Sequence, residues 1–396
     1  MPHPPYRLTA VLSAAALLGP AVVGTLTAPP AAQAALPVSA ATRATPRTAD
    51  GVLAGMSLEQ RVGQLFMVGT PATSASSATL AQIGRYHVGN VMLTGRSYAG
   101  TRGPARVAAK MQARATKPAT DGVRLLVSTD QEGGNVQVLR GRGIAAIPTG
   151  LRQGRYSTTR LRSAAGTWAR QLRAAGVNMN LAPVLDTVPG PAAARRNPPI
   201  GVYKREYGYT PARVASHGTA FAAGMDAHGV VPTIKHFPGL GRVTANTDTA
   251  RRVTDRTTRR GDEYLTPFRH AIRAGHAPFV MMATAYYPRM DKKNPAAFSP
   301  FIINTVLRHD LGFSGAVISD DLGNARQVSA WSYGARAVKF VKAGGSVVLT
   351  VNPGKLPAMY RAVLARAKAD PGFRAKVDSA ALLVLKVKER RHLLGG

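Results

Sequence analysis

The sequence predicts a single (β/α)8 barrel, and two observations lead to that prediction. Eight short apolar segments alternate with helical segments over about three hundred residues, which is the usual size of such a barrel. Several helical segments end at a glycine directly before the next apolar segment, as at Gly176, Gly229, Gly275 and Gly312. A doubly wound open sheet is the alternative. It would normally carry a glycine-rich phosphate loop, and residues 131–135 lack the G-x-G-x-x-G spacing.

The predicted strands are short and rich in apolar side chains, as expected of strands buried on both faces of a parallel sheet. In chain order they are Leu65–Val68, Val88–Leu93, Arg124–Ser128, Met179–Pro183, Val230–Lys235, Phe279–Ala283, Ala316–Ser319 and Ser346–Thr350.

Capping residues mark the starts of the predicted helices. Ser57 and Gln60 form a capping box, and Thr210-Pro211 and Thr266-Pro267 each place a cap before a proline. The other helices between strands are predicted at 79–86, 104–115, 159–175, from Ser299 and at 331–343. Two more, at 356–369 and 377–391, follow the last strand and are expected to pack on the outside of the barrel.

The N-terminus reads as an export signal. Arg7 precedes the apolar stretch Leu8–Thr27, and Ala32-Gln33-Ala34 supplies a cleavage site of small residues. We therefore predict a signal peptide over 1–35, a flexible linker over 36–54 and the barrel with its C-terminal helices over 55–396. The protein is expected to be secreted, and because it has no cysteine its stability must come from its core without disulfides.

The charge of the chain is strongly unbalanced, with 52 basic and 19 acidic residues and a formal net charge of +33. For an exported protein this predicts an anionic cell wall as a partner, or else a charge that only maintains solubility. Nucleic acid is not predicted as a partner because no binding motif and no basic stripe with interleaved aromatic residues occurs. No membrane partner is expected once the signal peptide is removed, since no other apolar run reaches about 18 residues.

Ionisable residues follow four of the predicted strands. They are Asp130, Asp186, the pair Lys235-His236 and the pair Asp320-Asp321. Each has a structural alternative, such as a helix cap, a turn, a buried ion pair or a core histidine. The C-terminal strand ends of a barrel share one face, and catalytic groups gather there. Together these residues therefore favour an active site.

The residue types restrict the chemistry. Neither a metal-binding H-E-x-x-H, nor a G-x-S-x-G nucleophile motif, nor a phosphate loop occurs, so no metal and no cofactor is predicted. Carboxylates beside a lysine and a histidine suit a polyhydroxylated ligand, and they are typical of glycoside hydrolases acting on a carbohydrate substrate.

Five motifs in this order resemble family-3 glycoside hydrolases, especially single-domain β-N-acetylhexosaminidases that act on peptidoglycan fragments. They are Asp130-Gln-Glu-Gly-Gly134, Asn180-Leu-Ala-Pro-Val184 with Asp186, Lys235-His-Phe-Pro-Gly239, Phe298-Ser-Pro300 and Ile318-Ser-Asp-Asp-Leu322. The resemblance spans Met56 to the C-terminus.

The resemblance implies roles for individual residues. Asp320 would be the nucleophile that forms a covalent glycosyl-enzyme. The groups that would bind sugar hydroxyls are Asp130, Arg205, Lys235 and His236. The family's Gly-Gly-Arg is changed at Asn135, and its sugar-binding arginine would be displaced to Arg140.

One departure concerns the general acid/base, which is a histidine in the hexosaminidase branch. Here Leu240 occupies an earlier histidine position, and the acid/base position falls on Ala250 or, in a gap-free alignment, on Asp248. Asp248 would then be the acid, or another group on the loop 242–262 would serve, or the acid has been lost. The last case predicts a slow enzyme or a glycan-binding pseudoenzyme. A family-3 β-glucosidase or xylosidase is a further alternative.

Overall fold

A computed structural model describes residue 24 and residues 47–395 of the chain. Apart from residue 24, the predicted signal peptide lies outside the described residues, as does most of the predicted linker. The end of that linker is a helix, α1 (Ala49–Gly55), which Thr48 caps by accepting a hydrogen bond from the Gly51 amide. Buried Ala49 and Val52 belong to a small apolar cluster with Leu385. The folded unit therefore begins before the predicted boundary at residue 55.

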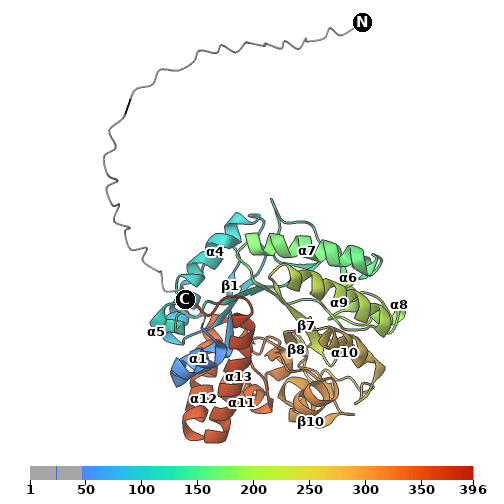
Figure 1. Cartoon of the computed structure of the whole chain (residues 1–396). Coiled ribbons are helices and arrows are strands. Elements are labelled where there is room, and N and C mark those ends of the chain that lie inside the picture. The colour runs from blue at the N-terminus through green and yellow to red at the C-terminus, as the bar shows by residue number, and fades with distance from the viewer. Residues whose placement is uncertain (1–23, 25–46, 396) are drawn as a thin grey trace. The chain divides into compact units, whose positions relative to one another are not determined.

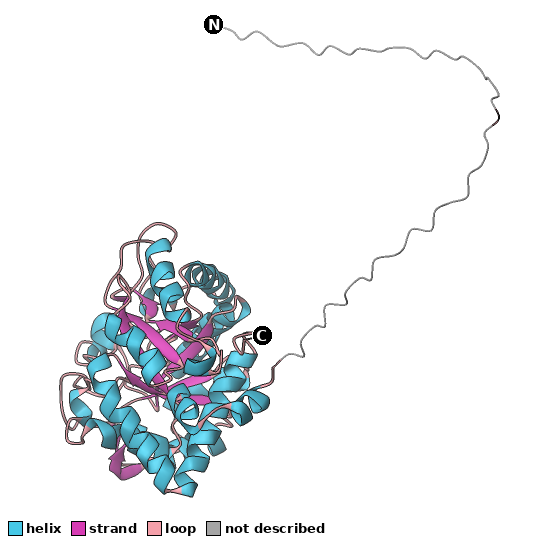
Figure 2. Cartoon of the chain, turned by 90° about the vertical axis from the view of Figure 1, so that its left-hand side faces the viewer, coloured by secondary structure: helices cyan, strands magenta, loops and turns pink. Residues whose placement is uncertain are grey.

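Eight parallel strands form one nearly closed barrel and confirm the predicted fold class (Figure 2). They are β1 (Phe66–Pro71), β2 (Asn90–Thr94), β3 (Leu126–Thr129), β6 (Met179–Asn180), β7 (Val231–Phe237), β8 (Phe279–Met282), β11 (Ala316–Ser319) and β12 (Val348–Thr350). Neighbours in space follow the chain order, and β12 pairs with β1. A single bridge between Ile318 and Val347 joins β11 to the last strand and completes the ring.

The helices surround the strands (Figure 1). Those longer than six residues are α1, α2 (Leu58–Gln64), α3 (Ser77–Arg85), α4 (Arg102–Gln112), α7 (Thr158–Ala174), α9 (Pro211–Ala227), α10 (Thr266–Arg273), the π-helix η4 (Phe301–Asp310), α11 (Tyr333–Ala343), α12 (Leu356–Ala369) and α13 (Pro371–Glu389). The predicted capping box of α2 is present, with Ser57 and Gln60 bonded reciprocally. Among the described residues, no helix is both long and apolar enough to cross a membrane.

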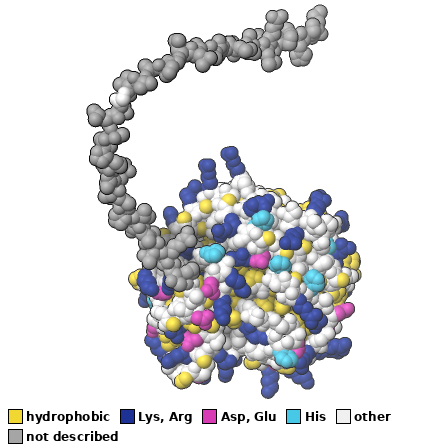
Figure 3. All heavy atoms as spheres, in the orientation of Figure 1, with side chains coloured by type: hydrophobic (Ala, Val, Ile, Leu, Met, Phe, Trp, Pro, Cys, Tyr) yellow, Lys and Arg dark blue, Asp and Glu magenta, His cyan; other side chains and the backbone are white. Residues whose placement is uncertain are grey.

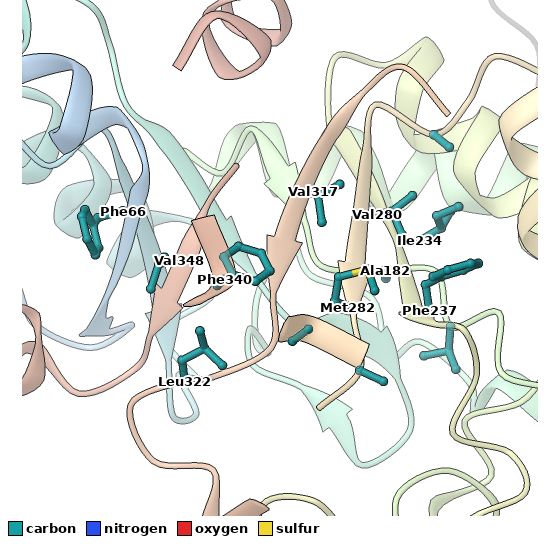
Figure 4. Close-up of a cluster of buried hydrophobic side chains, with 14 of the residues drawn as sticks. Phe66, Ala182, Ile234, Phe237, Val280, Met282, Val317, Leu322, Phe340 and Val348 are labelled. Carbon is teal, nitrogen blue, oxygen red and sulfur yellow. The ribbon is translucent and has the colours of Figure 1, made fainter. Parts of the chain in front are cut away.

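The core has two layers, because strand side chains alternate between the barrel interior and the surrounding helices. The interior is filled by side chains such as Met67, Met92, Leu126, Met179 and Leu181. The outer layer lies between the strands and the helices, and Figure 4 shows part of it, including Phe66, Phe237, Val280, Val317 and Phe340.

Two antiparallel hairpins at the C-terminal end of the barrel were not predicted. The first, β4 (Gln131–Gly133) with β5 (Val136–Gln137), contains the glycine-rich segment after β3, and the second is β9 (Tyr286–Tyr287) with β10 (Asp291–Pro295). Gly133 has φ +116°, and a Cβ there would lie 2.2 Å from the Pro148 carbonyl oxygen. The glycine therefore permits a tight hairpin that continues directly from the strand carrying Asp130.

Candidate active site

A cavity of about 590 Å³ opens at the C-terminal ends of the barrel strands. Its apolar floor includes Met92, Leu181, Met281 and Leu349. Six of the seven predicted site residues line it: Asp130, Arg205, Lys235, His236, Asp248 and Asp320. The barrel thus brings together the residues that directly follow β3 and β11, two residues of β7 and residues of two long connections, as expected for a barrel active site.

Lys235 is the centre of a buried charge network. Its ammonium group lies 2.7 Å from Asp130 and 2.6 Å from Glu132. Burial alone would lower the lysine pKa, but the two carboxylates outweigh burial and raise it above its ordinary value. Lys235 is therefore a permanent cation whose charge is balanced within the site.

Arg205 joins the same network from the connection between β6 and β7. It makes a two-pronged contact with Glu132, with Nε and an Nη 2.8 and 2.7 Å from the carboxylate oxygens, and it also donates to the Pro199 carbonyl. Burial would raise the pKa of Glu132, but Arg205 and Lys235 lower it to about 2. Both cations are thus held in fixed positions at the cavity wall.

Asp186 orients His236, which is one of the predicted sugar-binding residues. The Asp186 carboxylate accepts a bond of 2.7 Å from the His236 Nδ1–H, and it also accepts from the His236 and Leu240 backbone amides at 3.3 and 2.6 Å. Because Nδ1 is the donor, the Nε2 atom is the one left for a ligand. Asp186 is fully buried, so it positions the imidazole without lining the cavity.

The two carboxylates after β11 have different surroundings. Asp321 accepts backbone hydrogen bonds from Gly323 at 2.8 Å and Val351 at 3.2 Å, and a side-chain bond from Asn324 at 2.8 Å. Asp320 accepts one bond, 3.0 Å long, from the Asp321 amide. The hydrogen bonds of Asp321 therefore stabilise the loop, whereas the Asp320 carboxylate can accept further hydrogen bonds from a ligand in the cavity.

Asp248 lines the cavity, and the pKa of its carboxyl group is raised. Burial raises its pKa, and the negative charge of Asp320 raises it further, to about 6. Two carboxyl groups at one site, of which one holds its proton near neutral pH, can supply an acid and a nucleophile. This pairing is the requirement for retaining hydrolysis of a glycosidic bond.

Arg140 is the predicted site residue that does not line the cavity. Its guanidinium donates to the Gly134 carbonyl at 2.8 Å and so supports the β4–β5 hairpin. Arg96, after β2, lines the cavity instead and donates to the Asn135 carbonyl at 3.1 Å. The geometry therefore does not support the prediction that Arg140 is the sugar-binding arginine.

Glu132 is the principal residue that the sequence interpretation missed. It lies two residues after Asp130, and side chains two apart in an extended segment share a side. That spacing within the Asp-Gln-Glu motif was a usable signal. Unlike Glu132, the missed residues Arg96, Tyr203 and Asn324 line the cavity itself, and each lies in a connecting segment whose path the sequence does not reveal.

No group of three or more His, Cys, Asp or Glu side chains within residues 47–395 is arranged to hold a metal ion. The donors and acceptors at the cavity wall are those that hydrogen-bond hydroxyl groups, namely carboxylates, guanidinium and ammonium groups and an imidazole.

Comparison with known proteins agrees with this chemistry. Residues 57–387 match the model of the glycosyl hydrolase family 3 N terminal domain. A beta-hexosaminidase of Stenotrophomonas maltophilia (strain R551-3) is 33% identical over 313 residues, which cover 76% of this chain and 88% of that protein.

Two solved structures are similar in fold and sequence. The beta-N-acetylhexosaminidase from Beutenbergia cavernae DSM 12333 has a TM-score of 0.83 and 53% identity, covering 84% of this chain and 98% of its own. A family 3 beta-N-acetylglucosaminidase from Paenibacillus sp. str. FPU-7 has a TM-score of 0.77 and 34% identity, covering 85% of this chain and 63% of its own.

Proposed function

The chain belongs to glycosyl hydrolase family 3 and is a glycosidase of the β-N-acetylhexosaminidase type, and from this premise we propose that it is exported and removes β-linked N-acetylhexosamine from cell-wall fragments with retention. Asp320 is the nucleophile and Asp248 the general acid/base. Asp130, Arg205, Lys235 and His236 bind the sugar. The observation that carries the proposal is the raised pKa of Asp248, about 6, beside Asp320 in one cavity.

The reaction proceeds in two displacements. An Asp320 oxygen attacks the anomeric carbon while the Asp248 carboxyl donates its proton to the departing glycosidic oxygen. This forms a glycosyl ester and leaves Asp248 ionised. Asp248 then takes a proton from water, whose oxygen replaces the ester, so that the sugar is released with its original anomeric configuration. The gap-free alignment of Asp248 with the family's acid/base position and the nearby negative charge of Asp320, which raises the pKa of Asp248, both support this assignment.

Two substitutions test the two roles. Asp320→Asn should reduce turnover of every substrate by about 10³-fold or more while sugar binding persists. Asp248→Asn should lower kcat/KM for chitobiose by about 10²- to 10⁴-fold. It should alter the rate of glycosyl-enzyme formation from a dinitrophenyl glycoside far less, because that leaving group needs little protonation.

Other outcomes identify the alternatives. Equal losses on both substrates in Asp248→Asn would exclude the acid role. Binding without cleavage of either substrate by the wild-type chain would identify a pseudoenzyme. Faster cleavage of aryl glucosides or xylosides than of the N-acetylglucosaminide would assign the alternative sugar.

An anionic cell-wall polymer is the proposed partner outside the active site. All 19 acidic residues and all but two of the 52 basic ones lie in residues 47–396, and Figure 3 shows lysine and arginine side chains spread over one face. Several acids are buried in the site network described above, so the outer surface carries most of the excess positive charge. A second cleft, of about 760 Å³, adjoins the N-terminal ends of β8 and β11 and is lined by Lys386 and Arg390.

Polyphosphate of defined length is a simple probe of this partner. Wild-type affinity should fall steeply as salt rises from 50 to 300 mM. Lys386→Glu/Arg390→Glu should weaken binding more than the equal charge change Lys110→Glu/Arg114→Glu on exposed positions of α4 and its end. Equal weakening would mean that overall charge alone is responsible. Export is tested separately by N-terminal sequencing of the protein from culture medium, where a start near residue 35 is expected.

A further inference from the structure

The loop that carries Asp248 is attached to the segment that follows Asp320. The Arg326 amide donates to the Asp248 carbonyl at 3.1 Å, and the Gln327 amide donates to the Thr247 carbonyl at 3.0 Å. The catalytic loop between β7 and β8 therefore pairs, through its backbone at Asp248 itself, with the connection that leaves β11.

The Gln327 side chain makes a second attachment on the other side of Asp248. Its Oε1 accepts from the Val253 amide at 2.9 Å, and its Nε2 donates to the Val253 carbonyl at 3.3 Å. Gln327 is only 4% exposed, so these bonds form where water does not compete. Gln327 thus holds the acid loop at two points. One is Thr247, one residue before Asp248, and the other is Val253, five residues after it.

The segment between Asp320 and Gln327 is itself well ordered by hydrogen bonds. Asp321 binds the backbone amides of Gly323 and Val351, as described above. Arg336 donates to the Leu322 carbonyl at 2.7 Å and the Gly323 carbonyl at 3.2 Å. The nucleophile at the start of this segment and the anchor of the acid loop at its end are therefore parts of one folded unit.

The beginning of the acid loop is held independently. The Asn197 amide group donates to the Leu240 and Val243 carbonyls at 2.8 and 2.7 Å, and its Oδ1 accepts from the Ile200 and Gly201 amides. These contacts do not reach Asp248. Besides Gln327, the part of the loop around Asp248 is held by the Arg326 amide, by the Tyr286 amide, which donates to the Val253 carbonyl at 2.9 Å, and by Arg251, which donates to the Ser329 hydroxyl at 2.8 Å.

We propose that Gln327 is a positioning residue, which sets the separation between the Asp248 and Asp320 carboxyl groups by tying the acid loop to the segment 320–327. The proposal rests on the function proposed above. It requires no contact between Gln327 and the sugar, and Gln327 does not line the cavity. A displaced Asp248 would still titrate but would protonate the leaving oxygen less well, because proton transfer depends on hydrogen-bond distance.

The test compares two glutamines that make the same pair of bonds. Gln112 on α4 donates to the Leu125 carbonyl at 2.9 Å and accepts from the Leu125 amide at 3.0 Å, just before β3 and so at the opposite end of the barrel. Gln327→Met and Gln112→Met each keep side-chain length and remove both bonds. Gln327→Glu keeps the acceptor for Val253.

For Gln327→Met we expect kcat/KM for chitobiose to fall at least tenfold, and glycosyl-enzyme formation from a dinitrophenyl glycoside to fall less than threefold. Gln112→Met should leave both rates within twofold of wild type, although both methionine variants are expected to melt at lower temperature. Gln327→Glu should recover part of the chitobiose rate.

Equal losses on both substrates in Gln327→Met, or rates like those of Gln112→Met, would overturn the positioning role. The Asp248→Asn variant separates this result from a failure of the proposed function. If Asp248→Asn shows the selective loss and Gln327→Met does not, only the positioning proposal is wrong. If Asp248→Asn shows no selective loss, the acid assignment fails first.

Discussion

Each end of the barrel buries a lysine, and the pKa values of the two lysines are shifted in opposite directions. At the C-terminal end Lys235 contacts two carboxylates, and its pKa is raised despite burial. At the N-terminal end Lys388 donates only to the Gln64 Oε1 at 2.7 Å and the Gly89 carbonyl at 2.8 Å, and burial lowers its pKa to about 7. Full burial is common to both, so the partners decide the charge.

This difference separates a functional arrangement from a structural one. A balanced set of charges at the cavity wall offers strong hydrogen bonds to sugar hydroxyls while its members stay ionised. A lysine among neutral acceptors can satisfy backbone and amide oxygens, but near neutral pH it gives up part of its charge.

The largest effect is expected from Lys235→Met. This change leaves Asp130 and Glu132 with less compensation, and breaking a buried pair by removing one partner typically costs about 3 to 5 kcal/mol. Loss of the charged contact that we propose Lys235 makes with the sugar should also lower kcat/KM by about 100-fold. Urea unfolding and steady-state kinetics measure the two effects. An active variant of wild-type stability would show that the network is dispensable.

The pH profile of the site should follow Asp248. Its carboxyl group must be protonated to act as an acid, so kcat/KM for chitobiose should be highest below its pKa of about 6. Above that value the rate should fall about tenfold per pH unit. The fall should be absent for glycosyl-enzyme formation from a dinitrophenyl glycoside and in Asp248→Asn. A fall that persists in Asp248→Asn would assign the proton to another group.

Lys388→Met should leave activity unchanged and alter stability only. The lysine pKa is about 7 in the folded chain and near its ordinary 10.5 when unfolded, so between these values the unfolded chain binds more protons. Wild-type stability should therefore gain about 2 kcal/mol between pH 7 and pH 9 relative to Lys388→Met. Urea unfolding at both pH values measures this gain. Parallel behaviour of the two proteins would show that Lys388 keeps its charge.

The smallest effect is expected from Gln64→Glu. This change gives Lys388 a carboxylate partner, as Lys235 has at the C-terminal end of the barrel. The Gln64 Nε2 is buried without a hydrogen-bond partner, so replacing the amide removes no bond. Stability at pH 7 should change by about 1 kcal/mol or less, because the new charge pair roughly offsets its own desolvation. The rise between pH 7 and pH 9 should disappear. Lys388→Met/Gln64→Glu is the control, and it should be much less stable than either single variant.

The order of strands and helices was predictable because it depends on local patterns. Apolar runs, caps such as Ser57 and terminating glycines such as Gly312 act within a few residues, and all eight barrel strands lie where these patterns indicated. The hairpins after β3 and β8 were missed because their short, polar strands carry no such period. Helix α1 was missed because its seven residues owe their order to packing against distant α13.

For the site, the sequence could predict which residues take part but not how they are arranged. Strand ends and motifs identified Asp130, Lys235 and Asp320, and the rule that barrel strand ends converge predicted one cavity for them. The same reasoning could not exclude Arg140, since adjacent loops compete for the same space and the sequence does not show which arginine enters it.

The sequence by itself therefore determined the barrel, the charge of the chain and the kinds of group at the cavity, because composition and local pattern are properties of neighbouring residues. Only the tertiary structure decided that Glu132 pairs with an arginine 73 positions away and that Asp130 pairs with a lysine 105 positions away. It also decided which carboxyl group holds a proton near pH 6 and which buried lysine keeps its charge. Those properties depend on desolvation and on the nearest charges, and both arise only when distant segments pack together.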